Sequence, residues 1–114
     1  MHLQLAIEYD IRHEYEKAYN HYIYLINNQT TLQDFEVARC YCGAGKITFT
    51  IYNDKEKALR FFREGRILYP KTADNYLAAA EIYYNTHEYH KALELSLDCL
   101  KECEEAKWCN VYDI

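Results

Sequence analysis

The sequence contains little of the two residues that most often interrupt regular secondary structure, with 3 Gly and 1 Pro among 114 residues. A turn-rich barrel or sandwich usually contains more of both. An intrinsically disordered chain is also disfavoured, because 16% of the residues are aromatic, including 13 Tyr, and disordered chains are poor in aromatic residues. For this length we expect one helical domain with a continuous core.

Long apolar runs are missing as well. Stretches such as Leu77–Ala80 fall far short of the ~20 residues that cross a bilayer. The first ten residues have no basic start and no apolar run of signal-peptide length. We therefore expect a soluble cytoplasmic protein with no membrane partner. The odd number of cysteines predicts free thiols rather than a disulfide framework. They are Cys40, Cys42, Cys99, Cys103 and Cys109.

Motifs for catalysis or cofactor binding are weak. Gly43–Thr48 resembles part of a phosphate-binding loop, but Cys40 and Ile47 occupy the positions where that loop needs Gly and Ser or Thr. We interpret the glycines as sites of close helix crossing. No Ser/His/Asp or Cys/His arrangement is visible as a local signature. The expectation is a protein that is not an enzyme and has no catalytic residue and no cofactor.

A metal site is a less favoured alternative. Cys99 and Cys103 are one helical turn apart and could combine with His87 or His90. However, Cys99 stands where the repeat described below needs a small buried residue, and free Cys is often a small buried hydrophobe. No metal-ligating residue is therefore assigned.

An internal repeat is the strongest signal in the chain. The segment His13–Ala18 recurs as His87–Ala92, 74 residues later, with five of six positions identical. Between these segments, Lys57-Ala58-Leu59 precedes Lys91-Ala92-Leu93 by 34 residues. A 34-residue period with small and aromatic residues at fixed places is typical of tetratricopeptide arrays.

The residues of this pattern can be assigned to three units. They are Ala6, Tyr9, Ala18, Tyr22 and Leu25 in the first; Ala58, Phe62, Gly65 and Pro70 in the second; and Tyr76, Ala79, Ala80, Tyr83, Ala92 and Cys99 in the third. On these residues the chain resembles the tetratricopeptide repeat family over about residues 2–104. The resemblance implies an all-α, right-handed superhelix of three helix-turn-helix units, at about 1–33, 34–70 and 71–104. Residues 105–114 would then be a C-terminal cap or tail, with Trp108, Val111 and Tyr112 as its candidate buried side chains.

The pattern predicts six helices, at about 2–12, 15–27, 34–51, 54–68, 73–85 and 88–104. Asn53 and Glu56 are expected to form a capping box at the start of the fourth. The first and second units are 40 residues apart, whereas the second and third are 34 apart. We expect the segment Asn27–Thr31 to accommodate the six additional residues, either as a longer loop or as an extra helical turn. We expect Pro70 to end the fourth helix.

Two registers are open for the second unit. One places Lys46 at the helix crossing. The other places Ala44 and Gly45 there and needs one extra residue in the turn near Tyr52. We prefer the second, because burying an unpaired ammonium group between helices is costly.

The resemblance also implies a concave surface, formed by the first helix of each pair, that binds a peptide or helix of another protein. Well-known members bind chaperone carboxylate termini with a clamp of Lys, Asn and Arg. The corresponding positions here are Leu3, Ile7, Gly43 or Ala44, Asp74 and Ala78, so the clamp is missing. Besides Cys42, the expected partner-binding residues are Leu3, Ile7, Lys46, Phe49, Leu77, Glu81 and Tyr84.

We therefore expect a non-catalytic adaptor, co-chaperone-like protein or assembly subunit that binds a partner peptide or amphipathic helix. The alternative in the same class is self-association through the exposed ends as a homo-oligomer. Arg60, Arg63 and Arg66 form a basic stripe at helical spacing, which we interpret as a solvated outer face. Nucleic acid is disfavoured as a partner because the net charge is -5.

Overall fold

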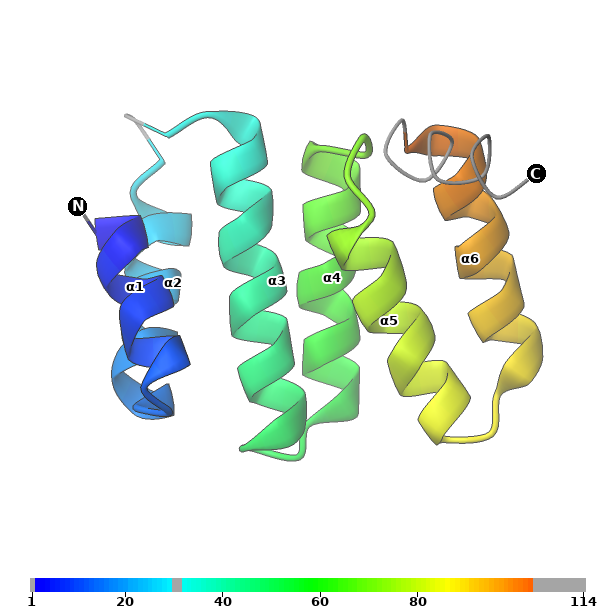
Figure 1. Ribbon diagram of the computed structural model, residues 1–114, viewed down its shortest axis with the longest axis horizontal. Helices are drawn as coiled ribbons and strands as arrows, with labels where there is room; N and C mark the ends of the chain where they lie inside the picture. Colours follow the sequence, from blue (N-terminus) through cyan, green and yellow to red (C-terminus); the bar gives the residue numbers. More distant parts are fainter. Residues whose placement is uncertain (1, 30–31, 104–114) are drawn as a thin grey trace.

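The computed structural model describes residues 2–29 and 32–103, and within them the chain is all-α. Figure 1 shows the helices following one another in chain order from the N-terminal to the C-terminal end, with the second helix lying behind the first. Their bounds agree with the sequence-based expectation to within one or two residues. The helices are α1 (His2–Ile11), α2 (Tyr15–Asn27), α3 (Asp34–Thr50), α4 (Lys55–Leu68), α5 (Asp74–Asn85) and α6 (Tyr89–Glu102).

The helices pack as three antiparallel pairs, α1 with α2, α3 with α4, and α5 with α6 (Figure 1). Successive pairs meet through α2 against α3 and α4 against α5. The first helices also touch one another, since α3 contacts both α1 and α5. The helices α1, α3 and α5 therefore form one layer, on which the partner-binding residues were expected. The cap expected at residues 105–114 lies outside the described residues.

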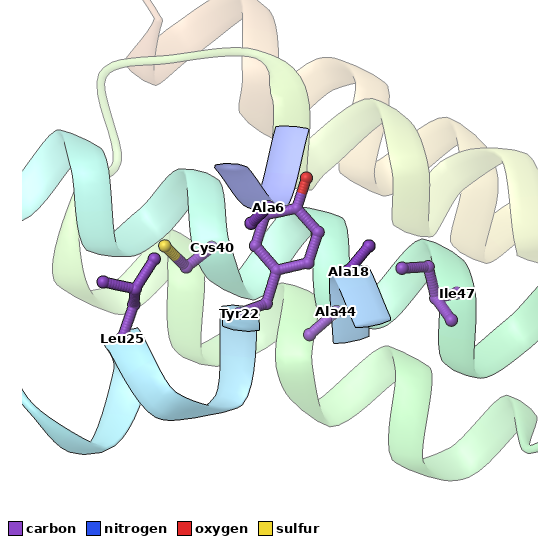
Figure 2. Close-up of a cluster of buried hydrophobic side chains, with 7 residues drawn as sticks. All are labelled: Ala6, Ala18, Tyr22, Leu25, Cys40, Ala44 and Ile47. Carbon is purple, nitrogen blue, oxygen red and sulfur yellow. The ribbon is translucent and has the colours of Figure 1, made fainter. Parts of the chain in front are cut away.

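Small residues allow the helices of the first two pairs to approach closely. Ala6, Ala18 and Ala44 are fully buried. Figure 2 shows the ring of Tyr22 amid these short side chains. A Cβ added at Gly43 would lie 2.5 Å from the Tyr22 ring, so this glycine leaves the space that the ring fills. Close helix packing of this kind needs small side chains at the contact.

The second pair has the preferred register. Ala44 and Gly45 are buried at the crossing, whereas Lys46 is exposed. A Cβ at Gly45 would lie 2.5 Å from the buried ring of Phe62. The turn from α3 to α4 contains four residues, against three in the other two pairs. The extra residue near Tyr52 is thus confirmed.

A left-handed residue ends the turn within each pair: φ is 64° at His13, 57° at Asn53 and 65° at His87. His and Asn tolerate this region better than most residues other than Gly. At His13 and His87 the next amide bonds back to the carbonyl of Tyr9 or Tyr83, as in a Schellman motif. The repeated sequence therefore folds into the same turn twice.

The capping box predicted at Asn53 and Glu56 is wrong. The N-cap of α4 is Asp54, whose side chain accepts a hydrogen bond from the Lys57 amide at 3.1 Å. Asn53 cannot cap, because it is left-handed like His13 and His87, two residues before the following helix. A reciprocal box is present instead at α3, where the Gln33 amide donates to Glu36 Oε1 at 3.1 Å.

The connections between pairs follow the expectation in part. α4 ends at Leu68, two residues before Pro70. α2 ends at Asn27 and α3 begins at Asp34, so the excess between the first two pairs is not an extra turn of α2. Asn28, Gln29, Leu32 and Gln33 lie outside the helices.

Candidate partner-binding surface

A hollow lies between α3 and α5 on the layer of first helices. Its volume is about 320 Å³. Both walls are helical, and the two helices contact each other directly. The residues that line it are Lys46, Phe49 and Thr50 of α3, Phe62 of α4, and Ala78, Glu81, Ile82 and Asn85 of α5.

The apolar part of the hollow belongs to the core of the molecule. Phe62, Ala78 and Ile82 are buried in one cluster, and Phe49 packs against that cluster while remaining half-buried. These side chains are held by helix packing on both sides, so the hollow has a fixed apolar lining. A preformed apolar cavity with a few polar groups is the usual form of a binding site.

The polar part consists of one charge from each wall. Lys46 on α3 and Glu81 on α5 are both exposed and both line the hollow. Neither forms an ion pair with another residue in the described part of the chain. The two side chains can therefore offer a donor and an acceptor to a bound segment without first breaking a contact.

Cys42 was expected beside these residues, but it is buried and points into the core cluster that contains Phe62 and Ala78. Burial raises the pKa of its thiol to about 11. The thiol is therefore protonated at neutral pH and acts as a small apolar side chain.

Leu3 and Ile7 lie away from this hollow. Ile7 lines a separate depression of about 380 Å³ that is formed by α1 alone, together with Gln4, Leu5, Glu8 and Ile11. Leu3 is half-buried and packs against the first core cluster. The structure thus brings together Lys46, Phe49 and Glu81, whereas Leu3 and Ile7 belong to another part of the layer.

Leu77 and Tyr84 lie on α5 outside the lining of the hollow. Their exposed fractions are 52% and 63%. The Tyr84 ring contacts Tyr89 of α6, with ring centroids 5.4 Å apart. Both residues are accessible, so a partner that extends beyond the hollow toward α6 would meet them.

Five lining residues were not predicted as partner-binding residues: Thr50, Phe62, Ala78, Ile82 and Asn85. Three of them follow from helix periodicity, because Ala78, Ile82 and Asn85 share one face of α5 with Glu81. Phe62 was assigned to core packing, which is also correct, since its buried ring forms the base of the hollow.

The cysteines and histidines considered for a metal site lie at opposite ends of α6. His87 precedes the helix, His90 is in its first turn, and Cys99 is in its last turn. Cys99 follows His90 by nine positions on the helix, about 13 Å along the axis. Among the described residues no group of three His, Cys, Asp or Glu side chains could hold a metal ion. The Cys103 thiol instead faces the carbonyl of Pro70 at 3.5 Å.

The basic stripe is only partly a solvated face. Arg60 and Arg63 are exposed, but Arg66 is half-buried. Arg66 donates to the Asn75 carbonyl at 3.4 Å and lies 5.7 Å from the centre of the Tyr76 ring. Burial lowers the pKa of its guanidinium group. Interpreting all three arginines as outer-face residues was therefore wrong for Arg66, which joins α4 to α5.

Comparison of the chain with protein-family models, curated proteins and solved structures finds no match. None of the described helices combines the length and apolarity that a membrane span requires.

Proposed function

We propose that this chain is a tetratricopeptide-like interaction module that binds a segment of another protein, without catalysis, in the hollow between α3 and α5. The observation that carries the proposal is the composition of that hollow. It combines a buried apolar base at Phe62 and Ile82 with the exposed charges of Lys46 and Glu81. The internal repeat and the resemblance based on it support the same function.

The bound segment would insert one large apolar side chain. A volume of about 320 Å³ lies at the lower end of ligand cavities in proteins, which suits an anchor residue rather than a whole small molecule. Phe49 and Ile82 would contact the anchor from the two walls. An amphipathic helix can present such an anchor while its polar face remains in water.

The charges would set the direction of the segment. A partner acid would pair with Lys46 on α3, and a partner base or amide would pair with Glu81 on α5. Charged groups at the rim of an interface contribute mainly to specificity and association rate. The apolar anchor would therefore provide most of the affinity.

The proposal can be tested by affinity capture with the full chain as bait, followed by calorimetry with the captured partner. Phe49→Ala should weaken binding by about 2 kcal/mol or more, the usual threshold of a hot spot. Arg60→Ala and Arg63→Ala on α4 are controls, and each should cost less than about 1 kcal/mol. Circular dichroism checks that each variant is folded.

Phe49 also packs against the core, so an exposed residue provides a second test. Glu81→Lys reverses one charge at the hollow without removing any buried contact, and it should weaken binding or change its salt dependence. Leu77→Asp shows whether the interface extends beyond the hollow, and we expect a loss of about 2 kcal/mol or more there too. If the arginine variants abolish binding while Phe49→Ala and Glu81→Lys bind normally, the hollow is not the binding site.

A further inference from the structure

Three leucines form an exposed stripe along α6. The exposed fractions of Leu93, Leu97 and Leu100 are 58%, 54% and 41%. Their spacing of four and then three residues places them on one side of the helix. Within the described residues α6 contacts α5 and no other helix. We call these three residues the α6 leucine stripe.

In the first two pairs, the residues that correspond to the α6 leucine stripe show which part of the molecule covers this side of the second helix. The residues 74 positions earlier on α2 are Tyr19, Ile23 and Ile26, and all three are partly buried against the core cluster that α2 shares with α3. The Tyr19 ring contacts Tyr52 and Phe61, at centroid distances of 5.3 Å and 6.5 Å. In the first pair, therefore, the next pair covers the stripe.

The second pair follows the same rule at the two ends of the stripe. The residues of α4 that precede Leu93, Leu97 and Leu100 by 34 positions are Leu59, Arg63 and Arg66, and the middle one, Arg63, is exposed but charged. Leu59 packs against the cluster shared with α5, and Arg66 bonds to the α5 backbone. Only on α6 does the corresponding face carry exposed leucines, among the helices that the structure describes.

The spacing of the stripe is also that of a coiled-coil seam. Positions separated by four and then three residues correspond to the d, a and d positions of a heptad, and such a stripe packs against a second helix with the same pattern. Leu97 is its midpoint. A second copy of α6, antiparallel to the first, would place Leu97 against Leu97 and Leu93 near Leu100 of the other copy.

Charges along one edge of the stripe fit this arrangement. Glu94 and Lys101 are exposed, and neither forms an ion pair within the described residues. They are seven residues apart on one helix, about 10 Å, which is too far for them to pair with each other. In an antiparallel pair centred on Leu97, Glu94 of each copy lies beside Lys101 of the other.

The opposite end of the molecule disfavours a head-to-tail stack. The residues 74 positions before Ala78 and Ile82, which pack against the preceding pair, are Gln4 and Glu8. Glu8 is also bound to Arg12 at 3.3 Å. An α6 leucine stripe docked on α1 would meet Leu5, Ile7 and Ile11, but it would also place Gln4 and Glu8, which line the same depression, against apolar side chains.

We propose that two copies of this chain associate through their α6 leucine stripes, in antiparallel orientation about Leu97. The contact is isologous, so it closes as a dimer and does not extend into a filament. It is also short, because a helix of 14 residues measures about 21 Å. A weak dimer with a concentration-dependent mass is therefore expected, and the hollow between α3 and α5 remains outside this contact.

Sedimentation equilibrium of the full chain over a wide concentration range tests the proposal. The wild type should approach twice the monomer mass at high concentration. Leu97→Asp should raise the dissociation constant by about 30-fold or more, which corresponds to a hot-spot loss of ~2 kcal/mol. Ile67→Asp is the matched control, because it removes an apolar side chain that is 66% exposed from α4, outside both proposed surfaces, and it should dimerise like the wild type.

Charge reversal tests the orientation. Glu94→Lys and Lys101→Glu should each weaken the dimer about three- to tenfold, as expected for exposed charge pairs. The double variant should restore wild-type association, because the pairs are then reversed but intact. Circular dichroism should show an unchanged helical fold in all of these variants, since both positions are exposed.

Three results would overturn the proposal. The first is a wild type that stays monomeric at every concentration, as it would if residues 104–114 of the same copy covered the stripe. The second is a dimer that Leu97→Asp leaves intact. The third is a double charge variant that is no better than the single ones. Partner binding through the hollow is measured separately with Phe49→Ala, so the two proposals can fail independently.

Discussion

The first and last helix pairs carry the same turn sequence and reproduce the same local structure. His13 and His87 are both left-handed, and each ring nitrogen Nδ1 bonds to the hydroxyl of the tyrosine two residues later. Lys17 lies 5.6 Å from the Tyr9 ring, and Lys91 lies 5.5 Å from the Tyr83 ring. Identical residues at identical spacing thus give the same contacts at both ends of the molecule.

The first and last pairs differ in the burial and the ion pairs that the neighbouring pair provides. Ala18 at the first crossing is fully buried, whereas Ala92 at the last is 9% exposed. Glu14 forms an ion pair only with Lys17 among the described residues. Glu88 forms one with Lys91 and a second with Lys55 of α4. The motif therefore determines the fold within a pair, and the position in the row determines burial and the contacts between pairs.

The largest expected effect concerns the two crossing alanines. Leucine at either site overpacks the helix contact, at a typical cost of 1–3 kcal/mol. We expect about 3 kcal/mol for Ala18→Leu, because α3 closes the space around it, and about 1 kcal/mol for Ala92→Leu. Urea unfolding measures both. Equal losses would show that the neighbouring pair does not determine the cost, and no loss at Ala92 would contradict its place at a crossing.

The next comparison uses positions 74 residues apart on α2 and α6. Ile23 is partly buried against the first core cluster, while Leu97 is 54% exposed. Ile23→Asp should destabilise the chain by about 2 kcal/mol, because it places a carboxylate at a buried contact. Leu97→Asp should change the stability of the monomer by less than about 0.5 kcal/mol. Thermal unfolding at low protein concentration separates these outcomes, and a large loss at Leu97 would show that its side chain is covered within the monomer.

The fold could be predicted from the sequence because its signals are local and repeated. Small residues at the crossings and the His-Glu-Tyr turn recur at fixed spacing, and each predicted helix begins and ends within two residues of the observed one. The capping box failed because Asn53 takes the place that His13 and His87 take in the other two turns. Each of the three lies two residues before the second helix of its pair and is left-handed, so the neighbouring Asp54 is the cap.

The candidate site was harder to predict, because it depends on the space between helices. Periodicity places Ile7, Phe49 and Leu77 on first helices, but it does not say which helices are close enough to enclose a hollow. α5 packs against α3 through a shared apolar cluster, and Asn75 also reaches across and donates to the Ala38 carbonyl at 3.2 Å. A Cβ added at Gly65 would collide with that same Asn75 side chain at 2.3 Å. No local pattern marks a contact of this kind.

The smallest expected effect concerns Glu88, whose carboxylate bonds to Lys55 at 2.6 Å and to Lys91 at 3.2 Å. These two bonds, with that to Lys55 the larger cause, lower the pKa of Glu88 from 4.5 to about 2. A carboxylate with a lowered pKa in the folded state stabilises the fold above its unfolded pKa, and that stabilisation is lost as the pH falls through the folded pKa. Glu88→Gln should therefore lower the melting temperature at pH 7. The difference from the wild type should shrink between about pH 4.5 and pH 2.

Glu14→Gln is the matched control for this last prediction, because Glu14 occupies the same place in the first turn. Its one ion pair, with Lys17 at 3.4 Å, is exposed, and isolated exposed pairs contribute little to stability. The melting temperature of Glu14→Gln should thus follow that of the wild type at every pH. Lys55→Met should reproduce most of the Glu88→Gln effect, because it removes the shorter of the two bonds. If Glu14→Gln and Glu88→Gln shift the melting temperature equally, the bond between α4 and the last turn does not distinguish the two pairs.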